Sequence, residues 1–265
     1  MKRFFTLLTF LFCVLSVWAQ KKLPEIKKVI ISDSIEVIVN QSEKNTCEYS
    51  GKNLSVKVKK GVLTVVRLEK VRMDVDGDVK KTSSNVQPKI ILNLNSNLEH
   101  FSAYHNAKVE FNNFSPKRII INLETNSVGL GSIKSTAFGL NLKSGAESYF
   151  NGNFRSTKIT VDSSKAVFEK YVSENSEFIV SGGSLMTIEG KTNNLKLSVS
   201  GLSRFEGLRL SSNYSLAEIS GNSDVFFNTA KTLNISAKNR SHIVLTGSPK
   251  ILEEKIEKGC KFSKR

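Results

Sequence analysis

Three aspartates in the segment 69–87 are the residues that most resemble a metal site. Asp74, Asp76 and Asp78 alternate around Gly77, as oxygen ligands do at the start of a calcium-binding loop. Such a loop needs a bidentate acid at its twelfth position and a helix on each side. The twelfth residue from Asp74 is Asn85, and neither flank has helical periodicity. We therefore interpret 69–87 as a charged surface loop and expect no metal.

Four serines are the candidate nucleophiles, because they recur at matching points of a repeated pattern. They are Ser184, Ser203, Ser223 and Ser241. A catalytic nucleophile is needed once and requires a partnered base. Four copies instead favour a ladder of hydroxyls that bind the backbone at corners.

Acids and histidines do not gather into a catalytic group. The repeats contain the aspartates Asp162 and Asp224, and their glutamates occupy different positions of the repeat: Glu147, Glu169, Glu189, Glu206 and Glu218. His100 and His105 precede most of the repeats, whereas His242 is near their end. General acid/base chemistry needs clustered groups. The sequence therefore predicts no catalytic residues and no cofactor.

Basic residues are the strongest candidates for binding. The formal net charge is +15, which favours anionic partners such as an acidic glycan or an envelope surface. Within residues 195–245 we expect a polyanion contact through outward side chains: Lys196, Arg204, Arg209, Tyr214, Lys238 and Arg240. The alternative is that these charges only keep the surface soluble. No aromatic-basic motif indicates nucleic acid.

A repeat of about 19 residues must position all these side chains. Residues 197–205, 217–225 and 235–243 each read apolar, polar, apolar, polar, then Gly or Asn, then a serine. This alternation predicts a strand with one buried face, followed by a corner. Eight apolar pairs continue the register at spacings of 18 to 20 residues: Phe101/Ala103, Ile121/Leu123, Leu140/Leu142, Ile159/Val161, Phe178/Val180, Leu197/Val199, Ala217/Ile219 and Ile235/Ala237.

This repeat predicts an all-β fold, a solenoid in which each coil stacks on the previous one and the apolar pairs form continuous columns. Each coil needs two or three short strands. Strands are also expected at 29–31, 35–39, 54–58, 62–66 and 88–94, with 54–66 forming a hairpin and 40–53 a polar turn.

The chain divides into four parts in this interpretation. Residues 1–19 have the basic start, apolar run and cleavage site of a secretory signal peptide, and the run is too short to span a membrane. Residues 20–95 form an irregular strand-rich start of the solenoid, 96–250 form the regular coils, and 251–265 form a cap or tail. Cys47 and Cys260 are expected to be free thiols, with a disulfide as the alternative.

The sequence resembles the head GIN domain family of exported Bacteroidetes proteins, also described as auto-transporter adhesin head domains. The matching features are the signal peptide, the strands at 29–39, 61–65 and 90–94, the Ser-Gly-x-Ser units at 200–203 and 220–223, and the closing 246–249. The resemblance covers about residues 24–250. It departs at 163–164 and 238–239, where other residues replace Ser-Gly. It implies a right-handed parallel β-helix-like fold, a role in adhesion or surface binding, and no catalytic residues.

We therefore expect an exported, non-catalytic module in the periplasm or at the cell surface, which binds a glycan or an envelope component. A carbohydrate-active enzyme on a β-helix and a purely structural envelope protein are the alternatives. The sequence predicts no oligomeric state.

Overall fold

The computed structural model describes residues 19–265 except 51–52, 69, 74–78 and 83–86. This part is built of strands, with no helix among the described residues, so it contains no helical segment able to cross a membrane. The predicted signal peptide lies outside the described residues except Ala19. Asp74, Asp76 and Asp78 lie outside them as well.

The first strands in chain order belong to the less regular part of the molecule. They are β1 (Ala19–Lys22), β2 (Lys28–Ser32), β3 (Glu36–Gln41), β4 (Thr46–Ser50), β5 (Leu54–Lys59), β6 (Val62–Arg67), β7 (Lys70–Met73), β8 (Val79–Thr82) and β9 (Lys89–Leu94). The repeats contribute β10 (His100–Tyr104), β11 (Lys108–Phe114), β12 (Arg118–Glu124), β13 (Val128–Lys143), β14 (Glu147–Asp162), β15 (Lys165–Ser181), β16 (Leu185–Val199), β17 (Arg204–Ile219) and β18 (Asp224–Ala237). The last three strands are β19 (His242–Thr246), β20 (Lys250–Ile256) and β21 (Lys261–Lys264).

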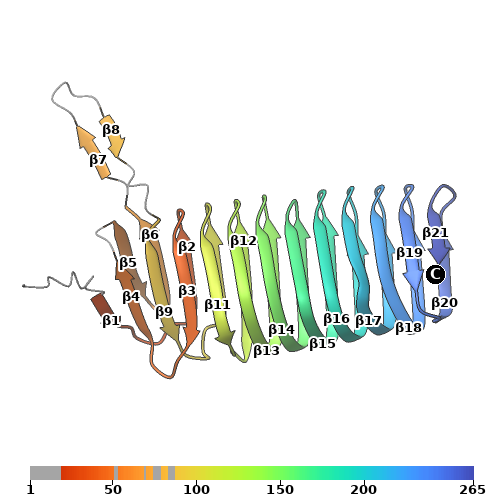
Figure 1. Cartoon of the computed structure of the whole chain (residues 1–265), viewed down its shortest axis with the longest axis horizontal. Helices are drawn as coiled ribbons and strands as arrows, with labels where there is room; N and C mark the ends of the chain where they lie inside the picture. Colours follow the sequence, from red (N-terminus) through yellow and green to blue (C-terminus); the bar gives the residue numbers. More distant parts are fainter. Residues whose placement is uncertain (1–18, 51–52, 69, 74–78, 83–86) are drawn as a thin grey trace, which may run out of the picture.

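These strands stack into an elongated parallel β-solenoid of about nine turns, with roughly 19 residues per turn, as the repeat predicts (Figure 1). Two walls face each other. Wall A comprises β6, β2, β10, β12, the second halves of β13 to β18, and β20. Wall B comprises β9, β3, β11, the first halves of β13 to β18, β19 and β21.

The two edges of each coil differ. At one edge a tight turn joins wall A to wall B, and residues such as Asn126, Gly182 and Gly221 there have positive φ angles. At the other edge β13 to β18 continue through the bend without a break, in strands of 14 to 17 residues. A coil of the regular part is therefore one long strand and one corner, rather than the two or three short strands expected.

Two apolar columns fill the inside of wall A. The parallel register places each predicted apolar pair directly beside the next, for example Val161 beside Val180 and Val180 beside Val199. None of the sixteen side chains is more than 2% exposed. The columns also continue beyond the prediction, through Val29 and Ile31 of β2 to β6. Stacking thus buries an apolar face that no single coil could bury alone.

The serine ladder is structural, as predicted. Ser203 Oγ donates to the carbonyl of Ser200 at 2.6 Å, and Ser223 and Ser241 make the same contact three residues back at 2.7 and 2.8 Å. Ser203 Oγ also accepts the amide hydrogen of Ser184 in the preceding coil, at 3.2 Å. These hydroxyls are buried and stabilise the tight turns, because they satisfy backbone groups that the turn removes from the sheet.

The ends of the stack are built differently. At the N-terminal end, antiparallel strands cover the edge: β5 pairs with β6, and β4 pairs with β9 and β1. At the C-terminal end, β20 and β21 form a further coil, and among the described residues they pair only with β18 and β19. Residues 251–265 therefore extend the solenoid.

Two predicted turn or loop segments contain strands instead. Residues 40–53 include β4, whose backbone is held between β9 and β1. The segment 69–87 includes β7 and β8, which pair antiparallel in a separate small sheet that projects from the N-terminal end (Figure 1). The predicted hairpin of β5 and β6 is confirmed.

Cys47 and Cys260 are free thiols. Cys47 lies in β4 near one end of the stack, and Cys260 lies between β20 and β21 at the other end. Burial raises the pKa of the Cys47 thiol to about 11.

Candidate binding groove

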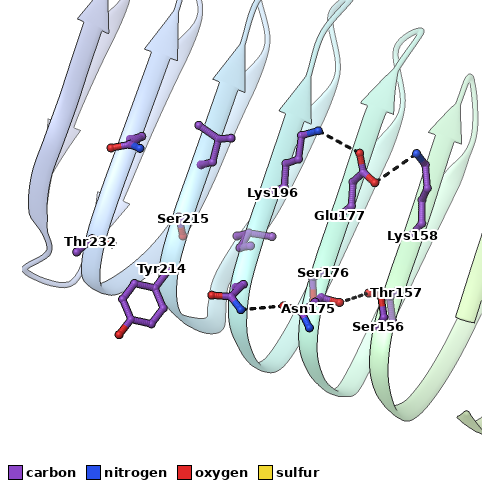
Figure 2. Close-up of a pocket in the computed structure, with 14 residues that line it drawn as sticks. Ser156, Thr157, Lys158, Asn175, Ser176, Glu177, Lys196, Tyr214, Ser215 and Thr232 are labelled. Carbon is purple, nitrogen blue, oxygen red and sulfur yellow. Dashed lines mark hydrogen bonds and ion pairs between the residues drawn. The ribbon is translucent and has the colours of Figure 1, made fainter. Parts of the chain in front are cut away.

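A groove of about 670 Å³ runs across wall A, over strands β14 to β18 (Figure 2). Its floor consists of two rows of outward side chains, which the parallel register aligns across five coils. The first, here called the amide row, contains Ser156, Asn175, Asn194, Tyr214 and Thr232. The second, here called the lysine row, contains Lys158, Glu177, Lys196, Leu216 and Asn234.

The sequence produces these rows by the same rule that produces the core. Successive residues of a strand point to opposite faces, so the polar residues between the buried ones face outward. Lys158 and Lys196 flank Ile159 and Leu197 of the apolar column. Because the repeat keeps its length, outward residues align coil by coil, about 4.8 Å apart.

A charged triplet lies in the lysine row. Glu177 Oε2 is 3.3 Å from Lys158 Nζ, and Glu177 Oε1 is 3.3 Å from Lys196 Nζ (Figure 2). Partial burial works against ionisation, but hydrogen bonds and charges from both lysines outweigh it and lower the pKa of Glu177. Glu177 is therefore a carboxylate at neutral pH, and it offsets part of the positive charge of the two lysines.

Two amides lie beside this triplet in the amide row. Asn194 Nδ2 donates to Asn175 Oδ1 at 2.8 Å. Within the described part of the chain, Asn175 Nδ2 and Asn194 Oδ1 have no further side-chain partner, so the pair retains one donor group and one acceptor. Both residues are exposed.

The far end of the groove is more apolar. Tyr214 and Leu216 each remain 40% exposed, which is unusual for large apolar side chains on this wall. Tyr214 projects outward from its strand (Figure 2), and Lys231 Nζ lies 5.6 Å from the centre of its ring. Asn234 Oδ1, in the next coil, is buried without a hydrogen-bond partner.

Buried hydroxyls support the floor from inside. Tyr171 Oη contacts Ser176 Oγ at 2.6 Å and also contacts Thr157 Oγ1, while Ser176 Oγ is 2.8 Å from Thr192 Oγ1. Burial raises the pKa of Tyr171, although its hydroxyl partners oppose this. The hydroxyl chain joins three coils and fixes the floor at the polar end of the groove.

The structure brings together two of the six predicted binding residues, Lys196 and Tyr214. Lys238 lies in a neighbouring depression of about 420 Å³ on the same wall, with Glu218 and Lys255. Arg240 lies in a tight turn, with a φ angle of 57°.

The other two residues lie away from the groove and are partnered. Arg204 is on wall B, where its guanidinium is 5.0 Å from the Phe226 ring centre and 2.7 Å from Glu206. Arg209 Nη1 is 3.1 Å from Glu189 Oε2. The six residues therefore do not form one stripe, and the polyanion contact stays a prediction.

Four groove residues are not among those predicted from the sequence: Lys158, Asn175, Glu177 and Asn194. Their spacing carried the necessary signal, because the amide row repeats every 18 to 20 residues, like the apolar columns. The predicted residues were those that carry charge within residues 195–245, whereas the groove also follows the outward register of the earlier coils.

The described residues contain no group of three or more His, Cys, Asp or Glu side chains arranged to hold a metal ion. His105 and His242 each lie beside one aspartate, at 3.9 Å from Asp33 and 3.4 Å from Asp224. The first pair lies in the turns that follow β2 and β10, and the second lies in β18 and β19, so several coils separate them.

The fold places the chain among the β-solenoid proteins: two walls enclose a filled apolar core, and wall A carries a shallow groove. Residues 25–249 match the family described as "Putative auto-transporter adhesin, head GIN domain", and the chain belongs to this family. This confirms the resemblance inferred from its strands and serine units. No curated protein matches the sequence.

Solved structures share the fold at low sequence identity. A "putative lipid binding protein" from Parabacteroides distasonis has 12% identity and a TM-score of 0.64, with 94% of this chain and 96% of that chain covered. A "putative adhesin" from the same species has 13% identity, a TM-score of 0.63 and the same coverage. One from Parabacteroides merdae has 12% identity and a TM-score of 0.61, covering 94% and 95%.

Proposed function

We propose that this protein is an exported, non-catalytic binding module of the periplasm or cell surface, which contacts a glycan or another envelope component through the groove on wall A. One observation carries the proposal. Polar and aromatic side chains from five coils align there into one continuous surface, so the repeat creates an extended site. The adhesin-like family supports a surface-binding role.

The chemistry of the groove favours binding over catalysis. Its one carboxylate, Glu177, is held ionised between two lysines, whereas a general acid needs a raised pKa and a glycosidase needs a second carboxyl group nearby. The four repeated serines bind turn backbone and are buried. These features weigh against the alternative of a carbohydrate-active enzyme.

The test combines binding and turnover. The secreted form of the chain is incubated with acidic and neutral polysaccharides and with isolated envelope fractions, and both retention and new reducing ends or unsaturated products are measured. Retention without products is the expected result. New products would defeat the non-catalytic proposal. Absence of any retention, by glycan or by envelope fraction, would defeat the proposed binding function.

A further inference from the structure

We infer that the groove selects a neutral, linear glycan, which lies along the rod and across the strands; this inference rests on the proposed function. The direction follows from the register. The amide row crosses four intervals from Ser156 to Thr232, and at about 4.8 Å per interval it spans roughly 19 Å. An extended β-linked pyranose chain advances by a similar distance per ring, so successive rings meet successive coils.

A peptide strand is a poor occupant of this groove. The wall A segments of β15, β16 and β17 are each paired on both sides with neighbouring coils. Peptides that bind sheets commonly add a strand to a free edge, and these segments have none. Recognition here must therefore come from side chains alone.

The free side-chain groups match sugar chemistry. Asn175 Nδ2 can donate and Asn194 Oδ1 can accept, and a sugar hydroxyl does both. Asn234 Oδ1 is buried without a hydrogen-bond partner among the described residues, so it is covered as it stands, and the open polar groups are those of the asparagine pair. The exposed ring of Tyr214 offers a flat apolar face beside Leu216, on which the C–H face of a pyranose ring can pack.

The charges favour a neutral chain over an acidic one. Lys158 and Lys196 already share Glu177, which leaves the triplet with only one net positive charge, and an acidic sugar bound there would place its carboxylate against that of Glu177. The arginines that carry positive charge elsewhere do not help, because Arg204 and Arg209 are paired with glutamates away from the groove. The net charge of +15 is therefore not focused on this site.

The experiment uses an array of neutral and acidic linear oligosaccharides, followed by titration calorimetry with the best neutral hexasaccharide. We expect binding to a neutral glycan with little dependence on salt. Tyr214→Ala should weaken binding by about tenfold, while Tyr214→Phe, which keeps the ring, should stay within about threefold. The double variant N175A/N194A should also weaken binding by about tenfold.

Two matched controls lie off the groove. Tyr149 on wall B is also 40% exposed and has a lysine 5.3 Å from its ring centre, so Tyr149→Ala should leave affinity unchanged. Asn141 donates to Asn122 at 2.8 Å in another amide pair on wall A, in β12 and β13 outside the groove, so Asn141→Ala should also have no effect. Thermal unfolding verifies that each variant is folded.

Every other outcome overturns the inference. If acidic glycans alone bind, or if an envelope fraction binds while all neutral glycans fail, the neutral-glycan inference is wrong and the proposed function stands. A neutral glycan whose affinity responds to Tyr149→Ala and not to Tyr214→Ala would show that the groove is not the site. If neither glycans nor envelope fractions bind, the proposed function fails as well.

Discussion

Tyr171 and Ser176 share a hydrogen bond of 2.6 Å between Tyr171 Oη and Ser176 Oγ, inside the stack and beneath the groove. The Tyr171 side chain is completely buried. Its hydroxyl is satisfied by Ser176 of the same coil and Thr157 of the preceding coil, and this makes a polar chain acceptable in the core.

Tyr171→Phe should lower the free energy of unfolding by about 1–2 kcal/mol at pH 7, because Thr157 and Ser176 both lose a buried partner. Urea unfolding measures the change. Tyr149→Phe is the control: its hydroxyl binds Glu147 on the exposed surface, and its loss should cost less than about 0.5 kcal/mol. Equal effects of the two variants would contradict the buried-chain interpretation.

The same pair predicts a pH dependence. Burial raises the pKa of Tyr171 above its ordinary value of 10.0, so its neutral form is favoured in the folded state. The stability it contributes is complete below pH 10 and is lost as the pH rises through the folded-state pKa. Unfolding measured from pH 8 to 11 should therefore show the difference between wild type and Tyr171→Phe shrinking above pH 10. A difference in stability that stays constant with pH would argue against a raised pKa of Tyr171.

The two thiols should differ in reactivity. Cys47 is fully buried and its pKa is raised to about 11, whereas Cys260 is partly exposed. At pH 8 a chain starting at Gln20 should react rapidly with one equivalent of Ellman's reagent and with a second only on unfolding. Cys260→Ser should remove the rapid equivalent. Two rapid equivalents in the native protein would show that β4 opens readily.

Val180→Asp should cost about 3–5 kcal/mol, because it places an unpaired charge in the apolar column between Val161 and Val199. Its neighbour provides the control. Ile179 points outward on the same strand and is partly exposed, so Ile179→Asp should change the free energy of unfolding by less than about 1 kcal/mol. Chemical denaturation measures both, and similar costs would contradict the assignment of the two faces.

Gly190→Ala should destabilise the fold by at least about 2 kcal/mol. Its φ angle is 145°, and a Cβ atom there would lie 1.8 Å from the carbonyl oxygen of Tyr171. Gly183, in a tight turn, has a φ angle of 77° with nothing within 4 Å of the added Cβ. Gly183→Ala should therefore cost only about 1 kcal/mol of backbone strain. Thermal and urea unfolding compare the two, and a smaller loss at Gly190 would be inconsistent with the close coil contact.

The columns were predictable because two periods coincide in them. Alternation fixes the buried face, and the 19-residue repeat fixes the register, so pairs such as Phe178/Val180 are placed without knowledge of the rest. By contrast, β4 has a polar sequence and exists because β9 and β1 pair with it. The strand β4 therefore forms because of its partners elsewhere in the chain, and the local sequence pattern could not predict it.

The groove was predictable only in part. Its rows follow the same register as the columns, so Asn175, Asn194 and Tyr214 could be aligned from sequence. The charge balance of the groove and its surroundings could not be predicted, because it depends on ion pairs that join different coils. Examples are Arg209 with Glu189 and Lys196 with Glu177. From composition alone, the arginines of residues 195–245 were expected to be free to bind an anion.

The two ends of the stack are built differently, and this gives the chain a direction in which coils can be added during folding. The end covered by antiparallel strands is synthesised first, so a completed edge is available to the coils that follow. We expect the stack to extend coil by coil, because each coil contacts only its neighbours. The last described coil, β20 and β21, carries Lys250, Lys255, Lys261 and Lys264, and lysines on an edge strand disfavour pairing with another chain.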